Sequence, residues 1–398
     1  MNEIVVCADV HEGINFGWLI DPETGISARA IDIHKNFARV AEFAIKEKSK
    51  LFVILGDLFD RTHISPTYRE LIRKDVIEPL GNASINVWII AGNHDQPHTP
   101  KKGTSIDDFR GYPHVKVYKE PTAEKVAVNG KETLFIILPY LHPERIVDIG
   151  KKKLEKEISS EEMFALGQQV LKNWLLEKSK LDADFKILLA HYYVEGAKLR
   201  EVTYPEVLPG EFALKKEFIP PNLDLVVLGH VHLHQSLGRV GRAELVYTGA
   251  VERVDWGERD DEKGFLTINP LEKSFEFKRL PVRAMEKISV VIKPNEEPTN
   301  KILENIQDIK DKLIRLEVAL PGGMRARIKE SELAEKLKES FHYEIKWIEQ
   351  AEEKGEIISF TANPFELLKN FIEISYYEHP RKNELVNLGN EILKEVLE

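Results

Sequence analysis

The motif Gly56-Asp57-Leu58-Phe59-Asp60 follows directly on the apolar run Leu-Phe-Val-Ile-Leu at residues 51–55. An apolar, β-branched run of this length that ends in turn residues is typical of a buried strand in a sheet. In open α/β sheets, the ends of such strands are where ligands bind. Four further runs, at residues 4–7, 87–91, 187–190 and 225–228, end in the same way, at Asp9-Val10-His11, Gly92-Asn93-His94-Asp95, Ala190-His191 and Gly229-His230-Val231-His232.

We expect these five strand ends to bring carboxylates, an amide and several imidazoles to one edge of the fold. Such a set suits two divalent metal ions about 3.5–4 Å apart, which can polarise a phosphate and convert water into a nucleophile at neutral pH. Asp57 is the natural bridging carboxylate. Mixed nitrogen and oxygen ligation suits Mn²⁺, Fe²⁺ or Zn²⁺ better than Mg²⁺ or Ca²⁺. The predicted metal ligands are Asp9, His11, Asp57, Asn93, His191, His230 and His232.

Each motif alone is weak evidence for a metal site. A single buried His is more often a core residue with satisfied hydrogen bonds, and an Asp-x-His after a strand is common by chance. Taken together, however, a purely structural role would leave the whole set of polar groups at the strand ends without a function. Buried polar groups cost stability unless they are paired, so the metal site is the favoured interpretation.

Composition limits the class of protein. The chain has 398 residues, which is long enough for one large domain and one or two small ones. Its single Cys excludes an internal disulfide framework. It carries no signal-like N-terminal segment and no stretch near the roughly 18 apolar residues of a membrane span, which predicts a cytoplasmic protein. The formal charge of −10 means that any nucleic acid must be held by local basic loops, by metals or by a partner.

The pattern of elements predicts three regions. Residues 1–280 alternate strand-like runs with helical patterns at 33–48, 67–80 and 160–178, which indicates an α/β sandwich. Residues 281–349 follow a β-α-β-α-β pattern, which indicates a small separate domain. Residues 350–398 form a linker and a helical tail with helices expected at 364–374 and 383–397. The apolar stripe of the last helix contains Leu385, Leu388, Ile392, Leu393 and Val396.

The ordered set Asp-x-His, Gly-Asp-x-x-Asp, Gly-Asn-His-Asp, His and Gly-His-x-His resembles the calcineurin-like metallophosphoesterase superfamily over roughly the first 280 residues. The resemblance implies a β-sandwich flanked by helices and a dinuclear metal site. It implies that His94 is catalytic, contacting the substrate phosphate and assisting the leaving group. It also implies the ligand sets, with one metal held by Asp9, His11, Asp57 and His232 and the other by Asp57, Asn93, His191 and His230.

A second resemblance narrows the family. The segment Tyr247-Thr248-Gly249-Ala250-Val251-Glu252-Arg253-Val254-Asp255-Trp256-Gly257-Glu258, followed by Lys263-Gly264-Phe265, is similar to a segment of the SbcD-type nuclease subunits of DNA double-strand break repair. Residues 281–349 resemble that family's capping domain, and the tail resembles its ATPase-binding helices. The resemblance implies a Mn²⁺-dependent DNA exonuclease, and it leaves the balance of exonuclease and endonuclease activity open. It further implies an SbcC-type, SMC-like ATPase as partner, DNA as substrate and a homodimer.

The resemblance implies that the helix at 67–80 builds the two-fold dimer. Its apolar residues have an alternative role in core packing, and the sequence leaves both open. These residues are Tyr68, Leu71, Ile72, Val76 and Leu80.

The chain departs from its relatives in ways that bear on substrate preference. Asp60 stands where many archaeal and eukaryotic members carry a His that has been tied to exonuclease action, and Ala8 stands where a Ser is usual. Asp60 and Arg61 are candidate substrate-binding residues, and the Lys101-Lys102 pair is a further candidate for phosphate contact. Trp256 can either stack on a base or pack at the strand end.

Two other functions remain open at this stage. One is a metallophosphoesterase for small phosphodiesters or phosphomonoesters such as cyclic nucleotides. The long C-terminal extension and the Glu252-Arg253 to Glu258 segment argue against this function. The other is a non-catalytic, metal-stabilised scaffold, which the complete ligand set and His94 argue against.

Overall fold

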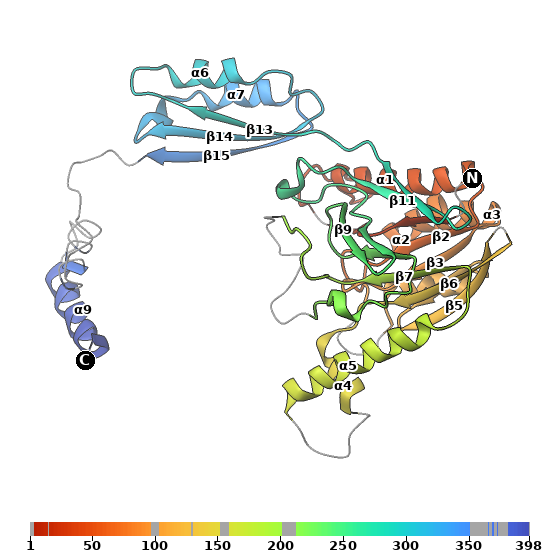
Figure 1. The fold of residues 1–398 in the computed structure, drawn as a ribbon. Coiled ribbons are helices and arrows are strands. Elements are labelled where there is room, and N and C mark those ends of the chain that lie inside the picture. Colours follow the sequence, from red (N-terminus) through yellow and green to blue (C-terminus); the bar gives the residue numbers. More distant parts are fainter. Residues whose placement is uncertain are drawn as a thin grey trace. The chain divides into compact units, whose positions relative to one another are not determined.

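The computed structural model describes residues 4–14, 16–96, 103–128, 130–151, 159–200, 212–350 and 381–397, together with 365, 368, 369 and 372 (Figure 1). Two six-stranded sheets dominate it. The first has the order β12-β11-β1-β2-β3-β4, in which β1 to β4 are parallel and β11 runs antiparallel to β1. Its strands are β1 (Ile4–Cys7), β2 (Leu51–Leu55), β3 (Asn86–Ile90), β4 (Val115–Tyr118), β11 (Gly264–Asn269) and β12 (Ser274–Arg279).

The second sheet has the order β5-β6-β7-β8-β10-β9, with parallel pairing from β6 to β10 and antiparallel strands at both edges. All five apolar runs expected from the sequence are strands, and the run at 51–55 matches β2 to the residue. The strands of this sheet are β5 (Thr122–Val128), β6 (Lys131–Leu138), β7 (Phe185–His191), β8 (Leu225–Gly229), β9 (Gln235–Val240) and β10 (Ala243–Tyr247).

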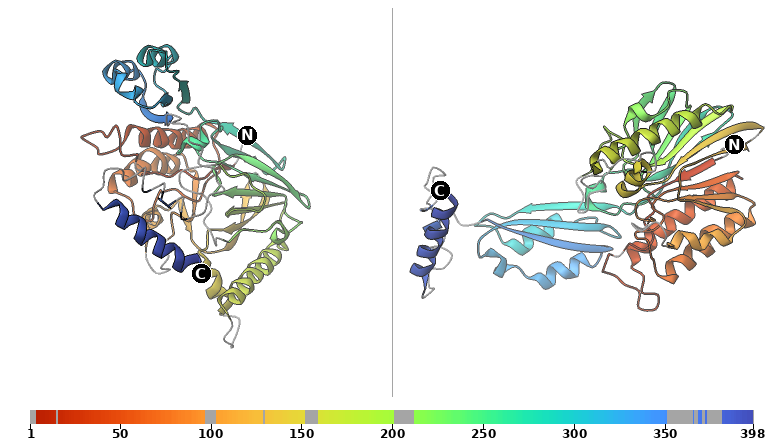
Figure 2. Two further views of the ribbon diagram at one scale, coloured as in Figure 1. Left: turned by 90° about the vertical axis from the view of Figure 1, so that its left-hand side faces the viewer. Right: turned by 90° about the horizontal axis from the view of Figure 1, so that it is seen from below.

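The two sheets pack face to face, and helices cover their outer faces (Figures 1 and 2). Alternate residues of one strand point to opposite faces, so Val6 packs between the sheets while Val5 packs under the helices beside Phe37. Both faces of the central strands are therefore buried, which explains why their sequences are continuously apolar. The predicted sandwich is confirmed. Its helices are α1 (Ala28–Lys46), α2 (Pro66–Ile72) and α3 (Glu78–Asn82) on the first sheet, and α4 (Pro143–Lys151) and α5 (Ser160–Ser179) on the second.

The segment expected as one helix at 67–80 is interrupted. A π-helical turn, η1 (Arg73–Ile77), separates α2 from α3. Pro79 has no N–H with which to continue an α-helical ladder, so regular α-helix cannot run through this point. Ile72, Val76 and Leu80 are fully buried in the core, as the core-packing interpretation expected. The homodimer stays a prediction.

A third sheet follows the sandwich in the chain, with the order β13-β14-β15. Its elements alternate as the sequence predicted: β13 (Met285–Val291), α6 (Pro298–Asn305), β14 (Leu313–Pro321), α7 (Glu330–Leu337) and β15 (His342–Gln350). By Cα proximity the chain forms two compact units, one of Met1–Ile288, Ile306–Leu316 and Ser331–Ile345, the other of Ser289–Asn305, Glu317–Glu330 and Lys346–Glu398. The predicted domain limits at 281 and 349 stay predictions.

The tail ends in α9 (Lys382–Leu397), which agrees with the helix expected at 383–397. Its stripe is partly open to solvent, since Leu388 and Ile392 are 56% and 53% exposed. The linker after residue 350 and most of the helix expected at 364–374 lie outside the described residues. None of the helices in the described part of the chain is both long enough and apolar enough to cross a membrane.

Candidate metal centre

The predicted ligands come from both sheets of the sandwich. Asp9 and His11 follow β1, Asp57 follows β2 and Asn93 follows β3, all in the first sheet. His191 ends β7, while His230 and His232 follow β8, in the second sheet. The five strand ends meet at one edge, as expected from the sequence, and two stacked sheets share that edge.

Two glycines allow the loops to approach this closely. A Cβ added to Gly56 would lie 1.9 Å from Nδ1 of His191, and one added to Gly92 would lie 2.1 Å from Oδ1 of Asp57. Both distances are far below contact distance, and the obstacles are buried side chains of the site itself. The glycines of these motifs are therefore required by the approach of the metal-site residues.

The backbone is strained where the ligands sit. Asp9, His11 and Asp57 have φ values of 53°, 54° and 51°, and His230 has a φ of 93°. Positive φ is uncommon for residues other than Gly, and such strain costs on the order of 1–3 kcal/mol per residue and concentrates at functional sites. The strain aims four of the predicted ligands into one small volume.

A first group consists of Asp9, His11 and His232, whose ligand atoms all lie within 4.8 Å of one another. Nε2 of His11 lies 3.0 Å from Nε2 of His232. Oδ1 of Asp9 accepts a hydrogen bond from the backbone N–H of His230 at 2.9 Å. The other carboxylate oxygen, Oδ2, is buried without a hydrogen-bond partner. A buried carboxyl group with an open oxygen beside two imidazole nitrogens suits a cation.

A second group consists of Asp57, His191 and His230, also within 4.8 Å of one another. Oδ2 of Asp57 lies 3.1 Å from Nε2 of His191 and 4.0 Å from Nε2 of His11, so this carboxylate lies between the groups. Oδ1 of Asn93 lies 3.2 Å from Nε2 of His191 and 2.9 Å from Nδ1 of His230. The structure therefore brings all seven predicted ligands together, with the Asp57 carboxylate between the two groups.

The electrostatics of the cluster also suit cations. Burial lowers the pKa of His191, but the Asp57 carboxylate outweighs it and raises that pKa to about 9. Burial raises the pKa of Asp57, yet His191 and His94 hold it well below its usual range. Burial, together with His232 and His94, lowers the pKa of His11, which leaves this imidazole neutral with a lone pair to donate. The ionised carboxylate of Asp57 and the neutral imidazole of His11 are donors of the kind that a dinuclear divalent metal site uses, whereas His191 has to give up its proton before it can bind a metal ion.

His94 lies at the rim of this cluster. Its Nδ1–H donates to the carbonyl oxygen of Asp60 at 2.7 Å, and its ring meets that of His11 edge-on, with 4.8 Å between centroids. The ligand atoms of His11, Asp57 and His94 also lie within 4.8 Å of one another. The geometry is therefore compatible with His94 either as a ligand or as a substrate contact.

The two predicted substrate residues differ in exposure. The Arg61 side chain is 59% exposed and pairs with Oδ2 of Asp60 at 3.1 Å. Oδ1 of Asp60 lies 3.9 Å from Nδ1 of His11, so this carboxylate lies behind the site. An open hollow of about 530 Å³ is lined by Arg61, His63 and Tyr68, next in the chain to the metal-site loops. Lys101 and Lys102 lie outside the described residues.

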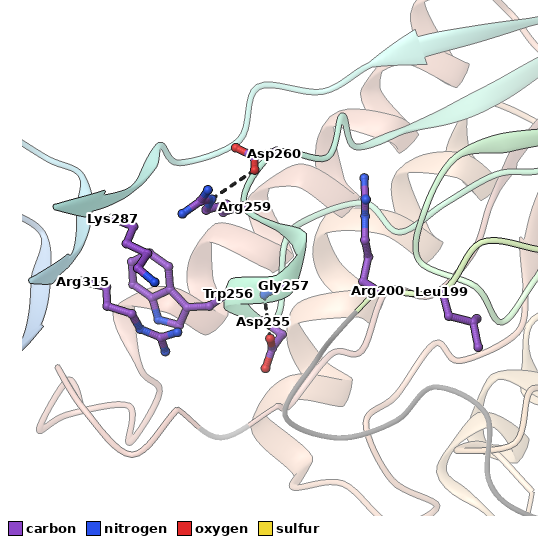
Figure 3. A pocket seen from close by; sticks show the side chains of 9 residues that line it. All are labelled: Leu199, Arg200, Asp255, Trp256, Gly257, Arg259, Asp260, Lys287 and Arg315. Carbon is purple, nitrogen blue, oxygen red and sulfur yellow. Dashed lines mark hydrogen bonds and ion pairs between the residues drawn. The ribbon is translucent and has the colours of Figure 1, made fainter. Parts of the chain in front are cut away.

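One face of the Trp256 ring is covered by a neighbouring side chain. The guanidinium carbon of Arg315 lies 4.5 Å from its ring centroid, in a hollow of about 550 Å³ that Lys287 also lines (Figure 3). This packing agrees with the alternative in which Trp256 has a structural role.

Asp95 is a buried residue of the site to which the sequence argument assigned no role. Its Oδ2 accepts from the N–H groups of Gly92 at 3.0 Å and Leu58 at 3.2 Å, and its Oδ1 accepts from that of Phe59 at 3.2 Å. It thus ties the loop after β3 to the loop after β2. Its place in the Gly-Asn-His-Asp motif was the available signal, because an Asx side chain near a glycine often caps nearby backbone N–H groups.

Comparison with known proteins agrees with this geometry. The DNA double-strand break repair protein Mre11 of Methanocaldococcus jannaschii is 25% identical over 293 residues, covering 71% of this chain and 69% of that protein. The SbcD polypeptide of the Bacillus subtilis nuclease SbcCD is 23% identical over 208 residues, covering 51% and 52%. The Mre11 of Archaeoglobus fulgidus is 26% identical over 324 residues, covering 75% and 63%. This chain thus spans about half to two thirds of the length of these relatives.

The predicted similarity to SbcD-type nuclease subunits is confirmed by these relatives. The family model for calcineurin-like phosphoesterases matches residues 3–234, a stretch that contains every predicted metal ligand. Because that match covers more than half of the chain, the chain belongs to the calcineurin-like phosphoesterase family.

Proposed function

We propose that this chain is a DNA nuclease that hydrolyses phosphodiesters with two divalent metal ions, as the SbcD-type subunit of a double-strand break repair complex. The observation that carries the proposal is the convergence of seven ligand side chains from two sheets into two groups around Asp57. The similarity to Mre11 proteins and to the SbcD polypeptide of an SbcCD nuclease supports DNA as the substrate.

In this proposal Asp9, His11, Asp57 and His232 hold one ion, and Asp57, Asn93, His191 and His230 hold the other. The ions supply Lewis-acid polarisation of the phosphate and a water nucleophile at neutral pH. The mixed donor set suits Mn²⁺, Fe²⁺ or Zn²⁺, and the resemblance to SbcD-type nuclease subunits makes Mn²⁺ the proposed metal. The complete donor set disfavours the non-catalytic scaffold.

His94 has the proposed role of substrate contact and proton donor to the leaving oxygen. Donation from its Nδ1–H to the Asp60 carbonyl leaves Nε2 for the substrate. Burial lowers its pKa, but the carboxylate of Asp57 and the Asp60 contact raise it above the usual value. A raised pKa keeps the imidazole protonated closer to neutral pH, as a general acid requires.

DNA is a polyanion, whereas this chain carries a formal charge of −10. We therefore propose that local contacts hold the substrate beside the site, with Arg61 as the first phosphate contact. Asp60 supports Arg61 through their ion pair and supports His94 through its carbonyl. A cytoplasmic location and the homodimer are further parts of the proposal.

Asp57→Ala tests the bridging role. We expect the variant to fold but to lose both metal ions and all hydrolysis, because the lost carboxylate is shared by both groups. Metal analysis of the purified protein and hydrolysis of bis-p-nitrophenyl phosphate measure the two effects. A variant that retains two ions per chain and hydrolyses at the wild-type rate would show that Asp57 does not bridge.

His94→Ala separates a substrate contact from a metal ligand. With the proposed role, the metal content stays at the wild-type value while turnover falls by roughly 10²- to 10⁴-fold, the range that general acid–base groups supply. The same metal analysis and assay apply. Loss of an ion would place His94 among the ligands instead.

Duplex DNA tests the substrate class. Labelled at the 3′ or the 5′ end and incubated with Mn²⁺ or Mg²⁺, it should be degraded by the wild type in Mn²⁺ and left intact by Asp57→Ala. Bis-p-nitrophenyl phosphate in parallel reports the metal chemistry alone. Hydrolysis of the small ester with every DNA intact would favour the small-phosphoester alternative.

Deletion of residues 362–398 tests the tail. Leu388 and Ile392 are exposed on α9, and an amphipathic helix of this kind commonly docks in a groove of a partner. We expect the deletion to abolish co-purification with an SbcC-type ATPase while the Mn²⁺-dependent hydrolysis of the isolated chain persists. An unfolded truncated chain, or one that binds the ATPase with unchanged affinity, would contradict this role.

A further inference from the structure

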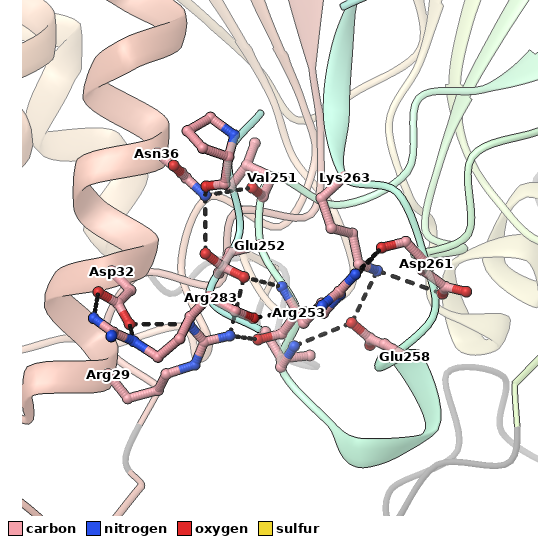
Figure 4. Close-up of polar contacts among 12 residues, drawn as sticks. Arg29, Asp32, Asn36, Val251, Glu252, Arg253, Glu258, Asp261, Lys263 and Arg283 are labelled. Atoms are coloured by element: carbon pink, nitrogen blue, oxygen red, sulfur yellow. Dashed lines mark hydrogen bonds and ion pairs between the residues drawn. The ribbon is translucent and has the colours of Figure 1, made fainter. Parts of the chain in front are cut away.

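The loop between β10 and β11, residues 248–263, carries the segment that resembles SbcD-type proteins. Its first half is fixed to α1. The carboxylate of Glu252, 2% exposed, accepts from Nη2 of Arg29 at 3.0 Å and from Nδ2 of Asn36 at 2.9 Å (Figure 4). The guanidinium of Arg253 spans the loop, donating to the carbonyl oxygen of Asp261 through Nε at 3.1 Å and Nη2 at 2.9 Å.

The second half of the loop reaches the metal centre through Glu258. This carboxylate is 1% exposed, and its Oε1 accepts the Nδ1–H of His232 at 2.8 Å. Its Oε2 accepts from Nζ of Lys263 at 2.9 Å and from the backbone N–H of Val254 at 3.0 Å. Both oxygens are therefore engaged by protein groups, which fixes the position of the Glu258 carboxylate beside His232.

Lys263 completes the arrangement. It is 1% exposed, and its Nζ donates to the backbone carbonyl oxygen of His232 at 3.0 Å as well as to Glu258. A buried ammonium is costly unless it is paired and hydrogen-bonded. Nζ of Lys263 also lies 3.7 Å from Oδ2 of Asp261 (Figure 4). Its two shorter contacts both lead to His232, one directly to the backbone and one through the carboxylate that holds the ring.

These contacts decide which ring nitrogen of His232 is available. An ionised carboxylate only accepts hydrogen bonds, so Nδ1 carries the proton and Nε2 carries the lone pair. That Nε2 is the atom that lies 3.0 Å from Nε2 of His11 in the first group of ligands. A hydrogen bond of this kind to the second nitrogen orients a ligating His and raises its basicity.

We propose that Glu258 and Lys263 are positioning residues for the metal ion held by Asp9, His11 and His232. Glu258 fixes the tautomer and the ring orientation of His232. Lys263 fixes the Glu258 carboxylate relative to the His232 backbone by binding both. The inference rests on the proposed metal site and not on DNA as the substrate. It assigns a physical role to Glu258 and Lys263 in the segment that resembles SbcD-type proteins.

Titration of the metal-stripped, full-length chain with Mn²⁺, followed by calorimetry, tests this inference. We expect Glu258→Ala to lower the affinity for one of the two Mn²⁺ ions by roughly 10- to 100-fold, the usual effect of removing a partner of a ligating His. The second ion should keep its wild-type affinity. Glu258→Gln keeps an acceptor oxygen but loses the charge, so its affinity for this ion should lie between those of the wild type and of Glu258→Ala. Lys263→Met should lower the affinity for the same ion.

Glu262→Ala is the matched control. It removes the same charge from the same loop, but Glu262 is 53% exposed and pairs only with Arg279, at 2.9 Å, among the ion pairs of the described residues. We expect it to bind two ions with wild-type affinity. The melting temperature of each metal-free variant separates a loss of fold from a loss of metal.

Wild-type affinity for both ions in Glu258→Ala, or in Glu258→Gln should the Ala variant fail to fold, would overturn the inference. An equal loss of affinity for both ions would also overturn the inference, since that result indicates a general loss of structure. An unchanged affinity in Lys263→Met would remove Lys263 from the assignment. Because the readout is metal binding, a wild type that leaves DNA intact would refute the proposed substrate while this test still gives its own answer.

Discussion

The burial of the Asp57 carboxylate between two sheets is the constraint on which the rest of the site depends. Asp57 is 2% exposed, and His191, His11 and His94 surround it. An ionised carboxylate in such a place is costly unless opposite charge and hydrogen bonds compensate for it. Two divalent cations would supply that compensation, and the carboxylate in turn sets where they bind.

The surrounding chain is built to tolerate this arrangement. The left-handed backbone at Asp9, His11 and Asp57 persists only because neighbouring structure holds it. Asp95 supplies part of that restraint by binding three backbone N–H groups of two site loops. Glu258 and Lys263 hold the ring and the backbone of His232. The hydrogen bonds around the ligands therefore stabilise a strained backbone that would not persist without them.

Much of this could be predicted from the sequence, for identifiable reasons. The strand at residues 51–55 was located to the residue, because strands buried on both faces are continuously apolar and end abruptly in polar turns. The ligand types were predictable because strand ends in such folds converge. The helix expected at 33–48 begins instead at Ala28, where Ser27 caps it by accepting from the N–H of Ala30 at 3.0 Å. A Ser before a helix is a usable signal, and here it was missed.

Other features could not be read from local patterns. The π-helical turn at Arg73–Ile77 lies inside a regular apolar spacing, and Asp75 within it pairs with His34 of α1 at 3.0 Å. The contact between Glu258 and His232 joins residues 26 positions apart, and nothing in either neighbourhood marks the other as its partner. Long-range pairs of this kind depend on the complete packing of the sheets, which periodicity does not encode.

The most direct measurement of the central claim is the electron paramagnetic resonance spectrum of the full chain loaded with two equivalents of Mn²⁺. Two ions that share the Asp57 carboxylate are magnetically coupled, so the account predicts the signal of a spin-coupled pair. The spectrum of isolated, uncoupled Mn²⁺ in the fully loaded protein would contradict a shared dinuclear site.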